Sequence, residues 1–274
     1  MRIVKDGDTT KVYIRQSWLK DAMMCNERGR YNMLPDYKGW SKPNELSAIG
    51  TSVHAAIEHD LTNLNVPIDE AVDVGLTTFH RISTDEAEPM RWVKYNDSQS
   101  RHYVEALYRK WAEFIRPQVR GQIIGVEQPF EFPLYSMSIL DGERIDVYGE
   151  GTIDLITTEQ LWDWKTASRK YNEKEKQESD VQSMMYVAAA AEMGLTSLPA
   201  KFNFGVMVRG GATQIVTVDR DKSHIMWLNR IIRPLVRQAL TIGTEDSWTV
   251  NDTHFLCNST WCPFWSVCRG AYQS

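Results

Sequence analysis

The sequence contains no long apolar segment. No run approaches the roughly 18 apolar residues that mark a candidate membrane-spanning helix, and the opening residues MRIVKDGDTTKVYIRQ lack the apolar core of a secretory signal peptide. We therefore expect a protein with no membrane partner. Its expected location is the cytoplasm of a bacterial, archaeal or virus-infected cell.

Positive charge is not in excess either. The chain carries 31 Lys and Arg against 36 Asp and Glu, a net charge of −5 at pH 7. This balance excludes a protein that is basic as a whole, but it is compatible with a local basic groove. No internal repeat or low-complexity linker divides the 274 residues, and 42% of them are hydrophobic, enough for a sizeable core.

Cysteine is scarce, and its four copies are unevenly placed. Cys257, Cys262 and Cys268 close the chain, whereas Cys25 lies more than 200 residues upstream. Cytosolic proteins rarely form structural disulfides, and their clustered cysteines more often bind metal. The spacing therefore predicts that both ends of the chain meet at a metal centre. Four thiolates suit either an iron–sulfur cluster or zinc, and two disulfides are the remaining alternative.

The hydrophobic pattern predicts an α/β fold. Helices are expected over 45–63, 69–83, 98–116, 173–193 and 223–240, and a further helix capped by Ser17 is expected to carry Cys25. Strands are expected over 122–132, 144–156, 161–166, 201–208 and 213–219. This order indicates one integrated domain in three parts. They are a helical N-terminal region (1–120), an α/β nuclease-like core (121–245) and a cysteine-rich segment (246–274).

Two neighbouring predicted strands carry acidic residues. Asp154 lies in GTIDLI, and LWDWK places Asp163 and Lys165 on one face of the next strand, because side chains two apart share a face. Converging carboxylates suit Mg²⁺ or Mn²⁺, and a nearby lysine can offset charge in a phosphoryl transition state. The pattern favours metal-assisted phosphodiester hydrolysis. The alternative is an exposed ion pair.

Two helices carry further candidate residues. Gln182 and Tyr186 share one face of the helix after these strands, because they are four positions apart. His54 lies on an otherwise apolar helix, where it is either a structural histidine or, beside the carboxylates, a nitrogen ligand of the metal.

Taken in order, these motifs resemble the RecB-type branch of the PD-(D/E)XK nucleases. The resemblance covers about residues 15–270 and rests on Gly50-x3-His54-x3-Glu58, Gly151-x2-Asp154, Asp163-x-Lys165 and Gln182-x3-Tyr186. The four cysteines, with Ser17-x-Leu19-x5-Cys25-x5-Tyr31, narrow it to members that contain an iron–sulfur cluster. Those members are AddB-type nuclease domains and small CRISPR-associated RecB-like exonucleases.

The resemblance implies a restriction-endonuclease-like core, which is a mixed central sheet flanked by helices. It implies that the catalytic Mg²⁺ or Mn²⁺ is bound by His54, Asp154, Asp163 and the backbone carbonyl of Trp164. Lys165 would be the catalytic lysine, while Gln182 and Tyr186 would position the DNA strand or the attacking water. The four thiolates of Cys25, Cys257, Cys262 and Cys268 would hold a 4Fe-4S cluster.

Two positions depart from the commoner family pattern. Asp163 stands where many relatives have Glu, and four residues rather than two separate Cys257 from Cys262.

The expected function is that of a metal-dependent DNA exonuclease that acts on single-stranded or end-frayed DNA. A partner protein in recombination or CRISPR adaptation is expected, whereas no oligomeric state is predicted. The alternatives are a non-catalytic DNA-binding or assembly subunit that keeps the nuclease fold, and a structural protein held together by zinc.

Two further sets of residues are candidate DNA contacts. Arg230, Arg233 and Arg237 recur along the last long helix as a basic stripe, which either contacts phosphates or is a solvated face. The tryptophans and tyrosines are possible stacking surfaces for unpaired bases, although most of them are expected in the core, and Trp162 and Trp164, which flank Asp163, are the first to test.

Overall fold

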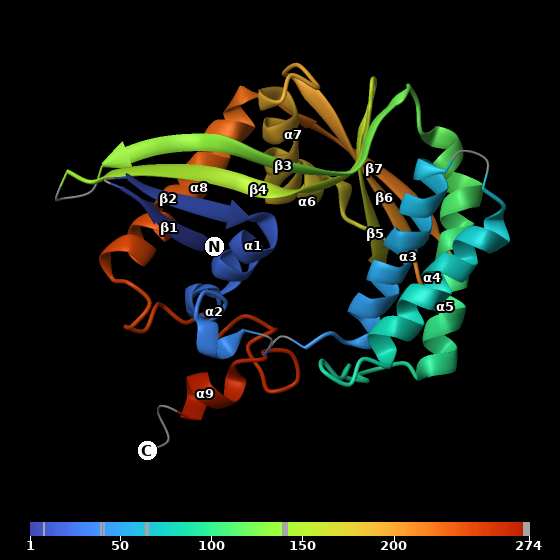
Figure 1. Cartoon of the computed structure of the whole chain (residues 1–274), viewed down its shortest axis with the longest axis horizontal. Helices are drawn as coiled ribbons and strands as arrows, with labels where there is room; N and C mark the ends of the chain where they lie inside the picture. The colour runs from blue at the N-terminus through green and yellow to red at the C-terminus, as the bar shows by residue number, and fades with distance from the viewer. Residues whose placement is uncertain (8, 39, 41, 64–65, 139–141, 271–274) are drawn as a thin grey trace.

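A seven-stranded mixed sheet forms the centre of the protein, with helices packed against it (Figure 1). The computed structural model describes residues 1–7, 9–38, 40, 42–63, 66–138 and 142–270. Its strands are β1 (Arg2–Asp6), β2 (Thr9–Arg15), β3 (Ile123–Ser138), β4 (Arg144–Thr157), β5 (Leu161–Ala167), β6 (Ala200–Val208) and β7 (Thr213–Arg220). The predicted α/β architecture, a mixed central sheet flanked by helices, is confirmed.

The helices lie mostly where the sequence predicts them. They are α1 (Gln16–Met24), α2 (Asn26–Tyr31), α3 (Glu45–Thr62), α4 (Ile68–Ser83), α5 (Asp97–Lys110), α6 (Glu173–Ser179), α7 (Val181–Glu192), α8 (Lys222–Thr241) and α9 (Trp265–Gly270). A π-helical turn (Trp111–Ile115) continues α5. None of the described helices is long and apolar enough to cross a membrane.

Strand β4 is long, and its two edges are paired differently. Strand β3 pairs antiparallel along one edge, from Arg144 to Thr157. On the other edge, β2 pairs parallel with Arg144–Glu150, and β5 pairs antiparallel with Leu155 and Ile156. Among the described strands, none pairs with residues 151–154 on this second edge. The sheet is therefore open between β2 and β5, next to Asp154.

The hairpin of β1 and β2 is not among the predicted elements. Residues 1–120 were expected to be helical, but β1 pairs with β2, and β2 joins the central sheet next to β4. Buried and partly exposed residues alternate along β2, with Thr10, Val12 and Ile14 buried. The first strands thus belong to the sheet.

The helix predicted over 173–193 is wrong as a single helix. It is divided at Asp180, whose extended backbone (φ −79°, ψ 103°) ends α6 and caps α7. The Asp180 carboxylate accepts a hydrogen bond from the backbone N–H of Ser183 at 2.8 Å. This break directs α7 across the sheet, so that Gln182 lies in its first turn.

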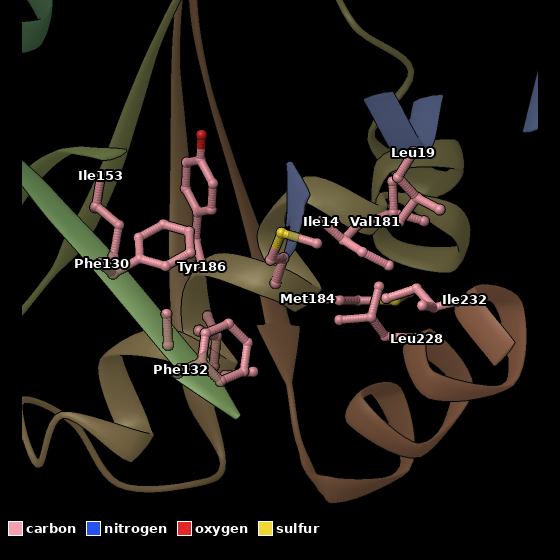
Figure 2. Close-up of a cluster of buried hydrophobic side chains, with 14 of the residues drawn as sticks. Ile14, Leu19, Phe130, Phe132, Ile153, Val181, Met184, Tyr186, Leu228 and Ile232 are labelled. Atoms are coloured by element: carbon pink, nitrogen blue, oxygen red, sulfur yellow. The ribbon is translucent and has the colours of Figure 1, made fainter. Parts of the chain in front are cut away.

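Two apolar cores lie on opposite sides of β5. In one core, α7 and α8 pack on β3 and β4, and Figure 2 shows Met184, Leu228 and Ile232 among its side chains. The other core joins α3, α4 and α5 to Trp162 and Trp164 of β5. Because alternate residues of a strand face opposite sides, Asp163 and Lys165 point away from these tryptophans.

The tryptophans do not form a stacking surface. Trp162 and Trp164 are each only 1% exposed, so of the two alternatives for these residues the structure shows the core and not a base-stacking surface. They are core residues that fix β5 against the helical layer.

The two ends of the chain meet beside α2, where Figure 1 shows the C-terminal segment leading to α9. The backbone N–H of Trp248 donates to Glu27 at 2.6 Å, and Asn251 donates to the carbonyl of Met24 at 2.9 Å. The ring of Phe264 stacks on Tyr31 with 5.0 Å between centroids. Most of segment 246–274 is therefore attached to the N-terminal helices, while residues 271–274 lie outside the described residues.

Candidate active site and cysteine pocket

A pocket opens where the sheet is split between β2 and β5. Its walls come from the start of α1, from α3 and α7, and from the four strands β2, β3, β4 and β5. The side chains that the sequence predicts to be catalytic or metal-binding all line it: His54, Asp154, Asp163, Lys165, Gln182 and Tyr186. We call it the active-site pocket.

Asp163 and Lys165 form an ion pair in this pocket. Asp163 is 1% exposed, and the Lys165 Nζ lies 2.8 Å from its Oδ1 and 2.6 Å from its Oδ2. Burial alone would lower the pKa of Lys165, but Asp163 and Asp154 outweigh burial and raise it. Lys165 is therefore a stable cation beside the carboxylates.

Asp154 is held by the backbone of the neighbouring strand. Its Oδ2 accepts a hydrogen bond from the backbone N–H of Trp164 at 2.6 Å. Burial and the nearby Asp163 carboxylate raise the pKa of Asp154 to about 6, although His54 and Lys165 act in the opposite direction. The carboxylates of Asp154 and Asp163 repel each other in a site that contains little water, and this repulsion strongly favours a bound cation.

His54 points from α3 toward the same carboxylate. The side chain and backbone of Asn44 form a capping box with Ser47 that fixes the start of α3, and the apolar stripe of this helix is fully buried as predicted. The His54 Nε2 lies 2.7 Å from the carbonyl oxygen of Trp164, and its Nδ1 lies 3.5 Å from Asp154. The helix and β5 thus present a nitrogen and a carbonyl oxygen to one position.

Glu127 of β3 joins this group, and the sequence did not single it out. One ligand atom each of His54, Glu127 and Asp154 lie within 4.8 Å of one another. Burial, followed by Asp154, Glu58 and Asp163, raises the pKa of Glu127 to about 7. Its φ of +47° is unusual for a residue with a side chain. No local sequence pattern distinguishes Glu127 from other strand residues.

This set of donors fits a hard divalent cation. Carboxylate and carbonyl oxygens are the ligands that Mg²⁺ and Mn²⁺ prefer, and Mn²⁺ also accepts an imidazole. The raised pKa values of Asp154 and Glu127 have the same physical origin, because several carboxylates share a poorly solvated space. A cation would relieve that repulsion.

Helix α1 supports the pocket from the side. Gln182 donates a hydrogen bond from its Nε2 to Asp163 at 2.5 Å. Its Oε1 accepts from Gln16 at 3.3 Å and from the Lys20 Nζ at 3.2 Å. Burial lowers the pKa of Lys20 to about 8. Gln16 and Lys20 were not identified from the sequence, because their role depends on contact with a residue more than 160 positions away.

Tyr186 lines the pocket from the core side. Its ring packs edge-on against Phe130 and Phe202, with centroids 5.4 and 5.9 Å apart, and only 8% of the residue is exposed (Figure 2). Burial and then the Asp163 carboxylate raise the pKa of its phenol. The hydroxyl is thus a neutral donor at the edge of the site.

The four cysteines line a second pocket, which we call the cysteine pocket, together with Tyr31, His254 and Phe264. All four are free thiols in this structure. Burial raises the pKa of Cys262 and Cys268, and in each case the other cysteines contribute. Residues from the two ends of the chain therefore share one site, as the spacing predicts.

The basic stripe of α8 lies away from both pockets. Arg230, Arg233 and Arg237 are exposed, and the guanidinium of Arg233 lies over the ring of Tyr135 at 4.5 Å. None of the three lines the active-site pocket. Their assignment to DNA stays a prediction.

Comparisons with known proteins were made for the whole chain. The model of the PD-(D/E)XK nuclease superfamily matches residues 29–269. The crystal structure of a "Putative exonuclease" from Eubacterium rectale is similar with a TM-score of 0.50 and 12% identity, covering 89% of this chain and 86% of that one. No curated protein matches the sequence. The restriction-endonuclease-like fold is confirmed.

Proposed function

Because the chain belongs to the PD-(D/E)XK nuclease superfamily, we propose that it is a divalent-metal-dependent, RecB-type DNA exonuclease. The observation that carries this proposal is the convergence of His54, Asp154, Asp163 and Lys165 on one pocket. The exonuclease part is supported by the resemblance to RecB-like exonucleases. The Eubacterium rectale protein of similar fold also carries the name "Putative exonuclease". Single-stranded or end-frayed DNA is the proposed substrate.

Different residues of the pocket would have different roles in phosphodiester hydrolysis. His54, Asp154, Asp163 and the Trp164 carbonyl would hold the metal, with Glu127 beside them. A bound divalent ion supplies an activated water and stabilises the leaving oxygen. Lys165, held as a cation, stabilises the negative charge that develops on the phosphate.

The remaining polar side chains keep this arrangement in place. Gln182 fixes the rotamer of Asp163 through its hydrogen bond. The Tyr186 phenol offers a donor to the DNA strand or the attacking water at the pocket rim. Neither residue needs to change its protonation state during the reaction.

We further propose that the cysteine pocket holds a 4Fe-4S cluster as a structural link. The support is that all four cysteines line one pocket, and four Cys thiolates are the usual ligands of such a cluster. The cluster would tie Cys25 to the C-terminal segment. A recombination or CRISPR-adaptation partner stays a prediction from the resemblance.

A nuclease assay tests the proposed function. Labelled linear and circular DNA are incubated with Mg²⁺ or Mn²⁺ and the wild type, Asp163→Ala, Lys165→Ala or the control Arg81→Ala, an exposed residue of α4. We expect linear DNA to be degraded by the wild type and the control, with activity at least about 100-fold lower in both site variants, as for loss of a major transition-state contact.

Three outcomes would contradict all or part of the proposal. Equal degradation by the wild type and both site variants would exclude this active site. Circular DNA cut as rapidly as linear DNA would contradict the exonuclease assignment while leaving the nuclease assignment in place. Tight DNA binding without cleavage by any protein would favour a non-catalytic subunit.

A further inference from the structure

A second groove adjoins the active-site pocket, and we call it the basic groove. One wall is the first half of α3, which contributes Gly50. The other elements are the end of β5, the loop over 168–172, the start of α6 and the residue that follows β6. Its cationic side chains are Arg169, Lys170, Lys176 and Arg209.

The basic groove begins where the active-site pocket ends. On β5, Lys165 lines the active-site pocket and the next residue, Thr166, lines the groove. On α3, His54 lines the active-site pocket, and Gly50, about one helical turn away, lines the groove. A Cβ on Gly50 would lie 3.3 Å from the Thr166 Oγ1, so the helix and strand are already close here.

The positive charge of the groove is largely uncompensated. Lys176 pairs with Asp180 at 2.5 Å. Among the described residues, no carboxylate oxygen lies within 4.0 Å of the cationic groups of Arg169, Lys170 or Arg209. Glu175 is the acidic side chain in the lining. In a chain with a net charge of −5, this gathering of cations beside the catalytic residues indicates an anionic ligand.

Arg209 provides a second, independent indication. Its Nε is buried and has no hydrogen-bond acceptor in the described part of the chain. A buried donor of a charged group without a partner costs free energy, because its lost contact with water is not replaced. A phosphate in the groove would supply an acceptor for the guanidinium group.

The loop that carries Arg169 and Lys170 is anchored. The backbone N–H of Tyr171 donates to the Gln214 Oε1 at 2.8 Å, and the Gln214 Nε2 donates back to the Tyr171 carbonyl at 3.2 Å. Lys176 lies over the Tyr171 ring at 4.6 Å. These contacts attach the loop to β7, so its two cations are held in position before a ligand arrives.

We propose that the basic groove binds the phosphates of a single DNA strand that continues from the active-site pocket. The lining residues from α3, Leu46, Ser47 and Gly50, are uncharged, and the cations come from the loop over 168–172, from α6 and from the residue that follows β6. These cations can neutralise the phosphates of one DNA strand, whereas a duplex would present the phosphates of two strands. The inference rests on the proposed function and assigns the substrate path to named residues.

Binding to a fluorescent single-stranded oligonucleotide tests the groove. Anisotropy is measured with Mg²⁺ at several salt concentrations in an Asp163→Ala background, which prevents cleavage. The groove variant Arg169→Ala/Lys170→Ala/Arg209→Ala is compared with Arg81→Ala/Lys201→Ala/Lys222→Ala. The control removes the same charge from exposed residues outside both pockets.

The expected difference follows from counterion release. Each phosphate contact contributes about 0.7 to the slope of log affinity against log salt for single strands. The groove variant should lower that slope by about 2 and weaken binding about 100-fold near 0.1 M salt, while the control changes affinity less than about 3-fold. Lys170→Ala alone, at an exposed position, should weaken binding about 5-fold and tests the groove if the triple variant fails to fold.

Groove variants that bind with the same slope and affinity as the control would overturn the inference. The test is separable from the proposed function, because it measures binding rather than cleavage. If DNA is cleaved by the wild type but the groove variants bind normally, the groove assignment fails alone. If groove variants lose binding but the wild type never cleaves DNA, the nuclease proposal fails and the groove assignment stands.

Discussion

At the scale of single residues, the site depends on charges held close together with little water. Asp154 and Glu127 both have raised pKa values because burial and neighbouring carboxylates disfavour their ionised forms. The neighbouring Lys165 remains charged for the opposite reason, since the same carboxylates favour its cation. The pocket is therefore an electrostatic arrangement that a divalent metal would complete.

Replacing Glu127 with Gln should weaken metal binding without disturbing the fold. The amide keeps the shape of the side chain but removes one negative charge from the group within 4.8 Å. We expect the Mn²⁺ concentration for half-maximal activity to rise by about 10-fold or more, the range seen when metal-site partners are lost. Metal titrations of nuclease activity measure this value.

Glu131→Gln is the matched control for this prediction. Glu131 lies on the same strand and lines the same pocket, but it is outside the group that could hold the metal. Equal metal requirements for both variants would show that Glu127 is not a ligand.

The chemistry of single residues was the most predictable part of the site. Alternation along β5 placed Asp163 and Lys165 together, and the structure brings His54 and Asp154 to them. Glu127 could not be predicted in this way, because its place in the group depends on an unusual backbone angle and on the pairing of its neighbours Val126 and Gln128 with β4. Neither the backbone angle nor the strand pairing can be predicted from the spacing of residues along the sequence.

At the scale of elements, helix α1 connects the two pockets. Gln16 and Lys20 contact Gln182 in the active-site pocket, and the helix ends one residue before Cys25 of the cysteine pocket. Its position is therefore set at both ends.

Lys20 should act as a positioning residue. Lys20→Met removes one of two donors to Gln182, a contact of about 1 kcal/mol, so we expect kcat to fall about 5-fold with little change in KM for DNA. Lys20→Arg should restore most of the activity because it keeps a charged donor. Steady-state kinetics on single-stranded DNA, with Lys222→Met as the control, test this prediction.

A variant with weaker DNA binding but an unchanged kcat would point instead to direct contact between Lys20 and the substrate. Unchanged kcat and KM would show that Gln16 alone is sufficient to hold Gln182.

Elements with strong local signals were predicted well, and those that depend on distant pairing were not. The capped, amphipathic α3 was expected almost to the residue. Strand β2 was missed because its parallel partner β4 lies more than 130 positions away. The break at Asp180 was missed because residues 173–193 contain no Pro or Gly to mark it.

At the scale of the whole molecule, the two ends of the chain hold each other. The N-terminal helices receive hydrogen bonds and ring contacts from the C-terminal segment, and the cysteine pocket lies at that junction. A group bound by all four thiolates would close a loop of more than 200 residues. Closing so long a loop restricts the unfolded chain and thereby stabilises the folded one.

Cys25→Ser should therefore release the bound group and lower stability. By analogy with cross-links of long loops, we expect a loss of about 2–4 kcal/mol and a decrease in Tm of at least roughly 5 °C. The anaerobically purified wild type should be brown and contain iron and sulfide. Ser266→Ala, in the exposed part of α9, is the control.

A colourless wild type with stoichiometric zinc would contradict the iron–sulfur assignment. A Cys25→Ser protein that keeps both its iron and its Tm would show that the thiol of Cys25 is not part of the link.

The central claim is that one divalent ion binds between α3, β4 and β5, beside Lys165. Anomalous diffraction from crystals of the protein grown with Mn²⁺ tests it most directly. We predict one strong manganese peak in contact with His54, Asp154 and Asp163, and its loss in Asp154→Ala crystals. Manganese bound only elsewhere on the protein, with these three side chains free of metal, would contradict the account.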